Sequence, residues 1–233
     1  MSILVEPVAG IGEVDPGDDL AGMLATALTA MDVTDSDVLV VTHKVVSKAE
    51  GAVVRLEDDG PDAHREVVEG EAVRILRRRG QLLIAETKHG FVCANAGVDR
   101  SNARPGTVIL LPADSDRSAR RIRDRLGAEL GIHPVVIISD TFGRPWRRGL
   151  VDVAIGVAGM TPIQDLRGSE DSFGRVLEAT EVNVADEAAA AADLVMGKAT
   201  GICAAVIRGL DFTPGTGSIA TDVIRPPSED LFR

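Results

Sequence analysis

The sequence of 233 residues has no tyrosine, a single tryptophan and only two cysteines, Cys93 and Cys203. With so few aromatic side chains, the core must be built from Val, Ile, Leu and Ala in a chain that is 45% hydrophobic. Two cysteines supply neither a disulfide framework nor the ligand spacing of a zinc site, which is typical of proteins from a reducing compartment. We therefore expect a cytoplasmic protein.

Long apolar runs and a basic N-terminal region are also missing. No segment approaches the length of a membrane span, and residues 1–7 lack the basic and apolar regions of a signal peptide. The formal net charge of −11 makes a general nucleic-acid surface unfavourable. We expect neither a membrane nor a nucleic-acid partner, although locally clustered arginines leave room for a small anionic ligand.

Short apolar strands and amphipathic helices alternate irregularly along the chain. This pattern predicts an α/β fold with a mixed (α+β) sheet rather than a regular βαβ array, and the length allows one large domain or two lobes. The predicted strands are residues 3–8, 37–42, 82–87, 91–94, 107–111, 135–141, 151–157, 175–182 and 202–207. The predicted helices are residues 20–31, 43–50, 62–79, 114–130 and 184–196, followed by a linker-like tail at 225–233.

One stretch concentrates polar chemistry at the end of a buried strand. Asp140 and Thr141 follow the apolar run 135–138, and arginines follow them. Carboxylate and hydroxyl oxygens suit Mg²⁺ or Mn²⁺, and arginine suits phosphate or carboxylate. The stretch is either a metal and phosphate centre or a β-turn with solvated arginines, and the residues alone leave both open. The arginines are Arg144, Arg147 and Arg148.

Two lysines and an acidic loop extend the same chemistry. Lys44 and Lys48 are spaced i, i+4 on the predicted helix 43–50, so they share a face that either meets an anion or is simply solvated. Asp99 lies in a polar loop, 95–102. Neither a Ser-His-Asp pattern nor a Walker A motif is present. Dispersed carboxylates, lysines and arginines fit metal-assisted phosphoryl transfer better than nucleophilic hydrolysis. The residues of the predicted strand 151–157 alternate like those of a half-buried strand, and this alternation places Asp152 on its polar side.

Four segments, in order along the chain, together resemble one family, the coenzyme F420:L-glutamate ligases. They are residues 42–51, 96–102, 139–147 and 186–198. The resemblance implies a GTP-dependent ligase that phosphorylates a carboxylate of coenzyme F420-0 or F420. The amine of L-glutamate then attacks the acyl phosphate and forms a γ-glutamyl amide. It also implies a two-lobed fold in an intertwined homodimer, with Mg²⁺ or Mn²⁺ as the divalent ion and K⁺ as a further candidate ion.

The resemblance assigns roles to individual residues. Metal ligands would be Asp99, Asp140 and Thr141, and Lys48 would be catalytic. Arg144 is a second catalytic candidate, from local charge density rather than from the resemblance. Contacts to GTP would come from the turn at 196–203, Ile11, Gly12, Glu13, Val14, His43, Lys48, Asn102 and Lys198.

The chain departs from the family pattern at two positions. Archaeal relatives carry Gln, linked with metal binding, where this chain has Lys198, and a protonated Lys has no lone pair for a metal. Some bacterial relatives carry Ser in place of His43. Actinobacterial relatives often continue into a C-terminal nitroreductase-like domain. We expect residues 1–233 to form the ligase domain, with two closely associated lobes and without that second domain, and the sequence leaves open whether it is a natural single-domain ligase or part of a longer protein.

Two other functions remain open at this stage. The chain could be another metal-dependent, nucleotide-using ligase or phosphohydrolase, or a non-catalytic nucleotide-binding module. For the ligase reading we expect the three arginines to contact the F420 phosphate or its glutamyl carboxylates. The number of glutamates added and the preferred metal are not specified by the sequence.

Overall fold

A six-stranded mixed sheet forms the centre of the molecule in the computed structural model, which describes residues 2–231. Met1 of the N-terminal segment and residues 232–233 of the predicted tail lie outside the described residues. Strands β2 and β8 are parallel, and the other neighbouring pairs are antiparallel. In spatial order the strands are β1 (Leu4–Pro7), β12 (Ala204–Arg208), β2 (Val38–Thr42), β8 (Val135–Arg144), β9 (Arg147–Met160) and β13 (Pro214–Gly215). The predicted mixed α/β fold is confirmed.

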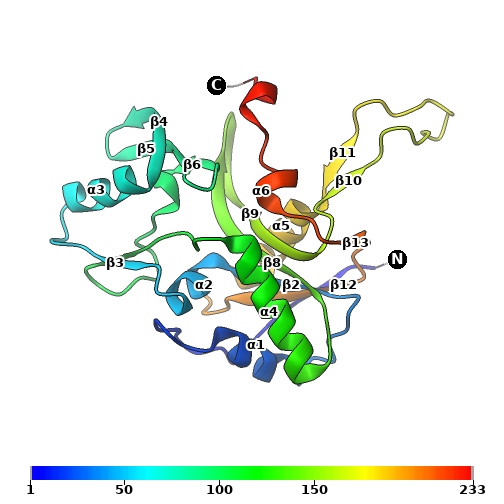
Figure 1. Ribbon diagram of the computed structural model, residues 1–233, viewed down its shortest axis with the longest axis horizontal. Helices are drawn as coiled ribbons and strands as arrows, with labels where there is room; N and C mark the ends of the chain where they lie inside the picture. The colour runs from blue at the N-terminus through cyan, green and yellow to red at the C-terminus, as the bar shows by residue number, and fades with distance from the viewer. Residues whose placement is uncertain (1, 232–233) are drawn as a thin grey trace.

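Helices cover both faces of this sheet (Figure 1). Successive side chains of a strand point to opposite faces, so in β2 Leu39 and Val41 pack toward one face while Val38 and Val40 pack toward the other. The first face is covered by α1 (Leu20–Leu28) and α4 (Ser115–Leu130). The second is covered by α5 (Val184–Met196), with the short α6 (Ile219–Asp222) beside it. All four β2 side chains are buried, as the continuous apolar run predicted.

Side-chain caps explain why three predicted helices begin where they do. Asp19, Asp114 and Asn183 each accept a hydrogen bond from the backbone N–H three residues ahead, at the starts of α1, α4 and α5. Helix α4 ends at Gly131, whose φ of 69° suits glycine. The α5 helix, which carries five successive alanines, packs closely on the sheet because its inward side chains are small.

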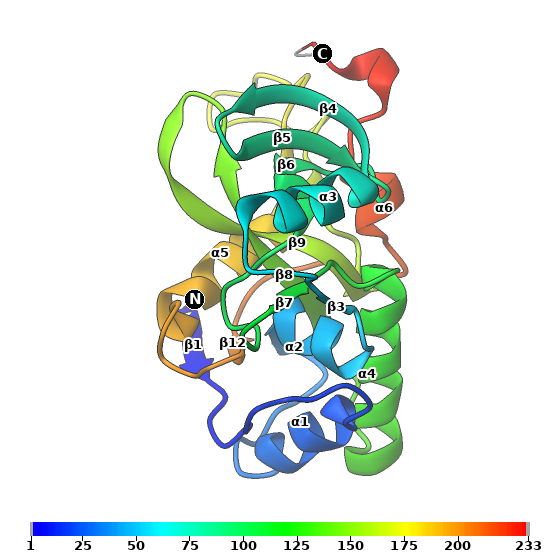
Figure 2. The same ribbon diagram turned by 90° about the vertical axis from the view of Figure 1, so that its left-hand side faces the viewer.

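Residues 53–110 surround a separate hydrophobic cluster that includes Leu56, Val68, Leu83 and Val108. In Figure 2, residues 61–94 of this part lie above the central sheet, and the two strands that flank them in sequence lie lower, at the height of the sheet. The polar loop that carries Asp99 lies near the end of this part of the chain and leads back toward the central sheet. This loop places Asp99 near the functional site described below. Its elements are β3 (Val53–Arg55), α3 (Pro61–Glu71), β4 (Ala72–Arg79), β5 (Leu82–Thr87), β6 (Val92–Ala94), the 3₁₀ turn η1 (Asn95–Gly97) and β7 (Thr107–Ile109).

The predicted single helix over residues 62–79 is wrong. Helix α3 ends at Glu71, and β4 follows directly, paired antiparallel with β5. Gly70 weakens the last helical turn, and the turn at Gly80, with φ of 59°, lets the chain reverse into the apolar strand β5. Pairing with that strand outweighs the local helical pattern. The arginines at 77–79 therefore do not complement a helix dipole.

The prediction that a strand ends at Asp140-Thr141 is also wrong. Strand β8 continues to Arg144 because β9 returns beside it as a long antiparallel hairpin. Its parallel neighbour β2, however, ends at Thr42, opposite Ser139. Asp140 and Thr141 therefore extend past the end of β2, next to α2 (His43–Ala49). At this point of the sheet Thr141 is half-buried, and Asp140 is buried.

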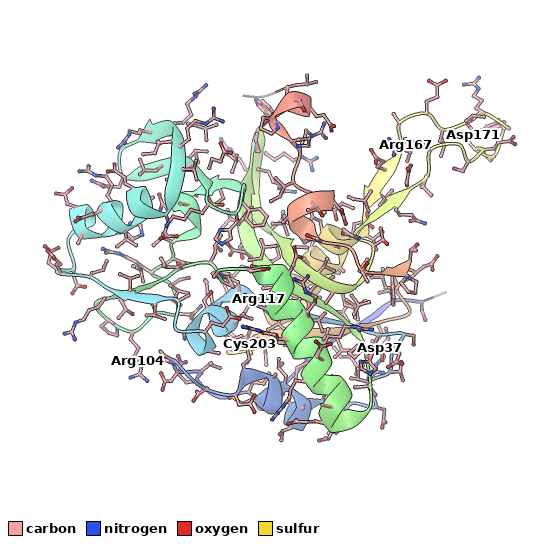
Figure 3. All side chains as sticks on the ribbon, in the orientation of Figure 1. Asp37, Arg104, Arg117, Arg167, Asp171 and Cys203 are labelled. Atoms are coloured by element: carbon pink, nitrogen blue, oxygen red, sulfur yellow. The ribbon has the colours of Figure 1, made fainter. Side chains whose placement is uncertain are left out.

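A second hairpin projects from the body of the molecule. Its base is formed by β10 (Ile163–Asp165) and β11 (Glu181–Asn183), and its tip carries the labelled Arg167 and Asp171 (Figure 3). The predicted strand 175–182 is largely a loop, with one bridge between Glu170 and Val176. The tail forms a 3₁₀ turn, η2 (Pro227–Glu229). Across residues 2–231, no helix has the length and apolar character needed to cross a membrane.

Candidate functional site

A cavity of about 400 Å³ opens where β2, β8 and β9 meet three loops. Its wall combines the Gly-rich segment after β1, the start of α2, the loop after η1 and the turn after α5. These segments are far apart in sequence, and the order of the sheet strands brings them together. The lining residues are Gly12, Glu13, Val14, Thr42, Lys44, Val45, Lys48, Asp99, Ser101, Asn102, Thr141, Leu150, Asp152, Asp193, Met196, Gly197, Lys198, Gly201, Ile202 and Cys203.

Both lysines of α2 point into the cavity wall. The side chains of Lys44 and Lys48 are 16% and 10% exposed. Lys44 Nζ donates to Asp99 Oδ2 at 2.7 Å, and Lys48 Nζ donates to Glu13 Oε1 at 2.5 Å. The alternative of a solvated basic face is therefore wrong, because the i, i+4 pair faces the carboxylates of two loops.

Asp99 is held in place by its own loop. Ser101 donates its backbone N–H to Asp99 Oδ1 at 2.6 Å and its hydroxyl to Oδ2 at 2.9 Å. Burial alone would raise the pKa of Asp99, but the hydrogen bonds from Lys44 and Ser101 hold that pKa below its ordinary value. Asn102 follows with a φ of 57° and also lines the cavity. Asp99 is therefore an ionised carboxylate beside a lysine at neutral pH.

The β8–β9 hairpin contributes a hydroxyl and a buried carboxylate to the wall. Thr141 lies opposite Asp152 in the register of the two strands, and Thr141 Oγ1 donates to Asp152 Oδ1 at 2.6 Å. Ser139 Oγ donates to Asp152 Oδ2 at 2.9 Å. Asp152 is only 2% exposed, so its predicted position on a polar outer side is wrong. Ser139 and Thr141 are two positions apart on one strand, so their side chains share a face. An antiparallel pairing that sets Asp152 opposite Thr141 places all three side chains together, and the sequence could have suggested this.

Lys198 supplies a third ammonium group, from the turn that follows α5. It donates to Thr141 Oγ1, to Asp152 Oδ1 at 2.9 Å and to Asp193 Oδ1 at 2.9 Å. Burial acts to lower the pKa of Lys198, yet the hydrogen bonds to Asp193 and Asp152 raise it above its ordinary value. Lys198 is thus a fixed positive charge. Asp193 had no assigned role in the sequence.

Asp140 lies beneath the cavity rather than in its lining. As neighbours on a strand, Asp140 and Thr141 point to opposite faces. Asp140 Oδ1 lies 3.1 Å from Nε2 of His43, which is fully buried. The two atoms are close, but among residues 2–231 the His43 Nε2 atom has no partner of hydrogen-bond geometry. His43 Nδ1 lies 3.4 Å from Ser47 Oγ.

The structure brings together most, but not all, of the residues assigned from the resemblance. Ile11 packs against the core, and His43 and Asp140 are buried behind the wall. Arg144 lies at the end of β8, outside the lining. The assigned residues that line the cavity are Gly12, Glu13, Val14, Lys48, Asn102, Lys198, Asp99 and Thr141, together with five residues of the predicted turn at 196–203 in addition to Lys198.

The rim of the cavity is tied by an ion pair between two of its loops. Arg104, labelled in Figure 3, donates to both carboxylate oxygens of Asp15, at 2.6 and 2.8 Å. Asp15 follows the lining segment 12–14, and Arg104 follows the loop that carries Asn102.

Cys203 also lines the wall of the cavity. Burial raises the pKa of its thiol to about 11, so the thiol is not a nucleophile at neutral pH.

The oxygen-bearing side chains at the cavity suit a metal ion that is coordinated jointly by the protein and by a bound ligand. Among residues 2–231, no group of three or more His, Cys, Asp and Glu side chains is arranged to bind a metal ion alone. Mg²⁺, however, is commonly held by one or two carboxylates plus substrate phosphates. Asp99 and the hydroxyl of Thr141 line the cavity and match that chemistry, whereas Asp140 lies behind the wall and its side chain points to the opposite face of β8.

Comparisons with known proteins point to a single family. The sequence pattern of the F420-0:gamma-glutamyl ligase family matches residues 10–209. The chain is 43% identical to a coenzyme F420:L-glutamate ligase of Methanothermobacter thermautotrophicus, over all of both chains. It is 44% identical to the enzyme of the same description from Methanopyrus kandleri, over all of this chain and 98% of that one. A third relative, from Methanocaldococcus jannaschii, is 40% identical over 90% of both chains.

Proposed function

The chain belongs to the F420-0:gamma-glutamyl ligase family and adds L-glutamate to coenzyme F420-0 in F420 biosynthesis, forming a C–N bond; we propose that it does so with GTP and a divalent metal in the cavity described above. The ligase family implies a nucleotide co-substrate. That the nucleotide is GTP, and that the product of phosphoryl transfer is an acyl phosphate, are parts of the proposal.

The observation that carries the proposal is the convergence of three lysine ammonium groups on one cavity. Lys44, Lys48 and Lys198 come from two segments about 150 residues apart, and each is paired with a carboxylate. A triphosphate would exchange these carboxylates for phosphate oxygens. Charge-assisted hydrogen bonds of this kind contribute about 1.5–3 kcal/mol each, so the three lysines supply direct partners for phosphate oxygens.

The charge balance of the wall also supports a requirement for metal. The lining carries four carboxylates against three ammonium groups, and Asp140 adds a further carboxylate behind the wall. A triphosphate entering such a cavity would meet net repulsion. We assign Asp99, Asp140 and Thr141 as the residues that would hold Mg²⁺ or Mn²⁺, with K⁺ as a further ion. When bound, a divalent ion neutralises phosphate charge and polarises the γ-phosphoryl group.

In the proposed reaction a carboxylate oxygen of F420-0 attacks the γ-phosphorus of GTP, and GDP leaves. The amine of L-glutamate then attacks the acyl carbon, phosphate departs with the attacking oxygen, and the amine loses its proton as the amide forms. Lys48 would hold the transferring phosphoryl group, and Lys44 would keep Asp99 ionised and oriented. The buried position of Lys48 excludes water from one side of the phosphate.

The nucleotide would be contacted by the segments that line the rest of the cavity. We assign this role to residues 11–14, Asn102 and the turn that carries Lys198; Glu13 would contribute its backbone, while its side chain gives way to phosphate at Lys48. His43 would act from behind the wall through Asp140, because its side chain is fully buried.

The exposed arginines of the β8–β9 hairpin are assigned to the acceptor. Arg144, Arg147 and Arg148 lie beyond Thr141 on the same hairpin, so an F420-0 molecule whose carboxylate reached the cavity would place its phosphate near them. This assignment rests on local charge density on an acidic protein. We keep Arg144 as a catalytic candidate for the same reason.

We further propose a homodimer. Two segments that leave the body of the molecule expose apolar side chains at their tips. Trp146 and Leu150 are 83% and 67% exposed on one hairpin, and Phe173 is 89% exposed on the other. Exposed large apolar groups of this kind commonly mark interfaces, and analytical ultracentrifugation tests the assignment: a monomer at micromolar concentration would contradict it.

The function is tested by incubating the protein with GTP, Mn²⁺, L-glutamate and F420-0. Mass spectrometry should show F420-0 gaining glutamate units, with one GDP released per glutamate. Release of GDP that does not depend on F420-0 would indicate a phosphohydrolase. Binding of GTP without turnover would indicate a non-catalytic module. ATP in place of GTP and Mg²⁺ in place of Mn²⁺ serve as comparisons for the nucleotide and metal assignments.

A further inference from the structure

We infer that Asp152 is a positioning residue, which orients the Thr141 hydroxyl so that it presents a lone pair to a metal ion and which anchors Lys198 beside it. The inference rests on the metal site of the proposed function. It concerns a residue to which neither the resemblance nor the charge pattern assigned a role.

The hydrogen bonds around Asp152 form a closed set. Its Oδ1 accepts from Thr141 Oγ1 at 2.6 Å and from Lys198 Nζ at 2.9 Å, while its Oδ2 accepts from Ser139 Oγ at 2.9 Å. Its side chain is 3% exposed. All three donors come from neighbouring parts of the wall, so the carboxylate has one orientation.

This arrangement determines the direction of the Thr141 hydroxyl proton. A hydroxyl has one proton and two lone pairs. The proton is committed to Asp152, and one lone pair accepts from Lys198. One lone pair remains, on a residue that lines the cavity. A hydroxyl whose proton pointed into the cavity would repel a cation, so the bond to Asp152 is what makes Thr141 a usable ligand.

The charge of Asp152 matters as well as its shape. A carboxylate is a stronger acceptor than an amide, so it increases the electron density on the hydroxyl oxygen, as carboxylates do behind metal-bound histidines. It also holds the ammonium of Lys198, whose second carboxylate, Asp193, lies on the far side. An apolar residue would satisfy the strand equally well, since Val151 and Val153 flank this position. Three donors offset the cost of burying the carboxylate here, and two of them, Thr141 and Lys198, line the cavity.

The test is the affinity for Mn²⁺, measured by electron paramagnetic resonance or calorimetry on the whole chain in the presence of GDP. We expect Asp152→Asn to weaken Mn²⁺ binding about 10- to 100-fold, the range usual for residues that orient metal ligands. The matched control is Ser139→Ala, which removes a hydrogen bond to the same carboxylate but touches neither Thr141 nor Lys198. It should leave the Mn²⁺ affinity within about threefold of wild type.

A double-mutant cycle separates positioning from a structural role. If Asp152 acts through Thr141, the Asp152→Asn change should cause little further loss in a Thr141→Val background. Additive losses, equal losses in Asp152→Asn and Ser139→Ala, or unchanged affinity in Asp152→Asn would each overturn the inference. Circular dichroism establishes that each variant is folded, and Asp152→Ser replaces Asp152→Asn if the latter does not fold.

Different experimental results would contradict the proposed function and the inference about Asp152. Absence of Mn²⁺ binding by the wild-type chain would remove the metal site and the inference with it. Normal Mn²⁺ binding by wild type with no effect of Asp152→Asn would overturn the inference alone. Failure of glutamate ligation, with the Mn²⁺ pattern as expected, would overturn the proposed function and leave the role of Asp152 intact.

Discussion

Lys48 and Glu13 offer the sharpest test of how the cavity binds a nucleotide. Lys48 Nζ lies 2.5 Å from Glu13 Oε1, and the lysine side chain is 10% exposed whereas the glutamate side chain is 66% exposed. The buried lysine has little freedom, and the exposed glutamate can swing away. A phosphate group entering the cavity would therefore replace Glu13 as the partner of Lys48.

The expected effects of two substitutions have opposite signs. Lys48→Met removes a charge-assisted hydrogen bond to phosphate worth about 1.5–3 kcal/mol. Since about 1.4 kcal/mol corresponds to tenfold in affinity, GTP binding should weaken roughly 10- to 150-fold. Glu13→Gln removes a competing charge and should strengthen GTP binding, by a smaller factor because the glutamate is largely exposed.

Isothermal titration calorimetry with GTP and Mn²⁺ measures both effects, and Lys48→Arg serves as the charge-conserving control. Wild-type affinity in Lys48→Met would refute the phosphate contact. Weaker binding in Glu13→Gln would show that Glu13 contacts the nucleotide itself rather than competing with it.

Three further predictions address other parts of the molecule. Asp116 is buried and accepts hydrogen bonds from Ser218 and from backbone N–H groups of β9 and α6, so Asp116→Ala should destabilise the fold by about 3–5 kcal/mol; a change of under 2 °C in thermal denaturation would contradict this. The depressed pKa of Asp99 stabilises the folded state at neutral pH, a contribution lost as pH falls through that pKa. Lys44→Met should raise the Asp99 pKa, so its carboxyl ¹³C resonance should titrate at higher pH; an unchanged titration would exclude Lys44 as the cause. Alanine at the three hairpin arginines should raise KM for F420-0 severalfold while leaving KM for GTP unchanged, and unchanged values for both would identify them as surface charges. Those arginines are Arg144, Arg147 and Arg148.

Local signals were sufficient for much of the fold. Capping residues such as Asp19, Asp114 and Asn183 mark helix starts through contacts that span only three residues. The apolar run of β2 and the short helix after it were predicted correctly for the same reason. These elements depend on neighbours in sequence, which a single chain displays.

Elements that depend on distant partners were harder to predict. Residues 72–79 form a strand because β5 pairs with them, although their pattern resembles a continued helix. Strand β8 runs past Thr141 because β9 returns beside it. In both cases the deciding hydrogen bonds join segments whose pairing the local pattern does not reveal.

The same distinction applies to the site. Lys48, Asp99 and Thr141 were named from segments that resemble the ligase family. Asp152 was missed because its significance depends on Lys198, which reaches it from a distant part of the sequence; Asp193, in the last turn of α5, gains its role from the same lysine. In the sequence, an aspartate within a strand is simply a polar residue. The alternation of apolar and polar residues therefore predicts that it faces solvent. Only the paired strand and the turn after α5 show why it is buried.

We propose that this chain joins glutamate to F420-0 through an acyl phosphate formed from GTP. Isotope transfer from F420-0 labelled with ¹⁸O in both oxygens of the acceptor carboxylate tests this route. We expect one ¹⁸O in each inorganic phosphate released and one ¹⁸O retained in the amide product, as measured by mass spectrometry. Product amide formed while the released phosphate carries no ¹⁸O would contradict it.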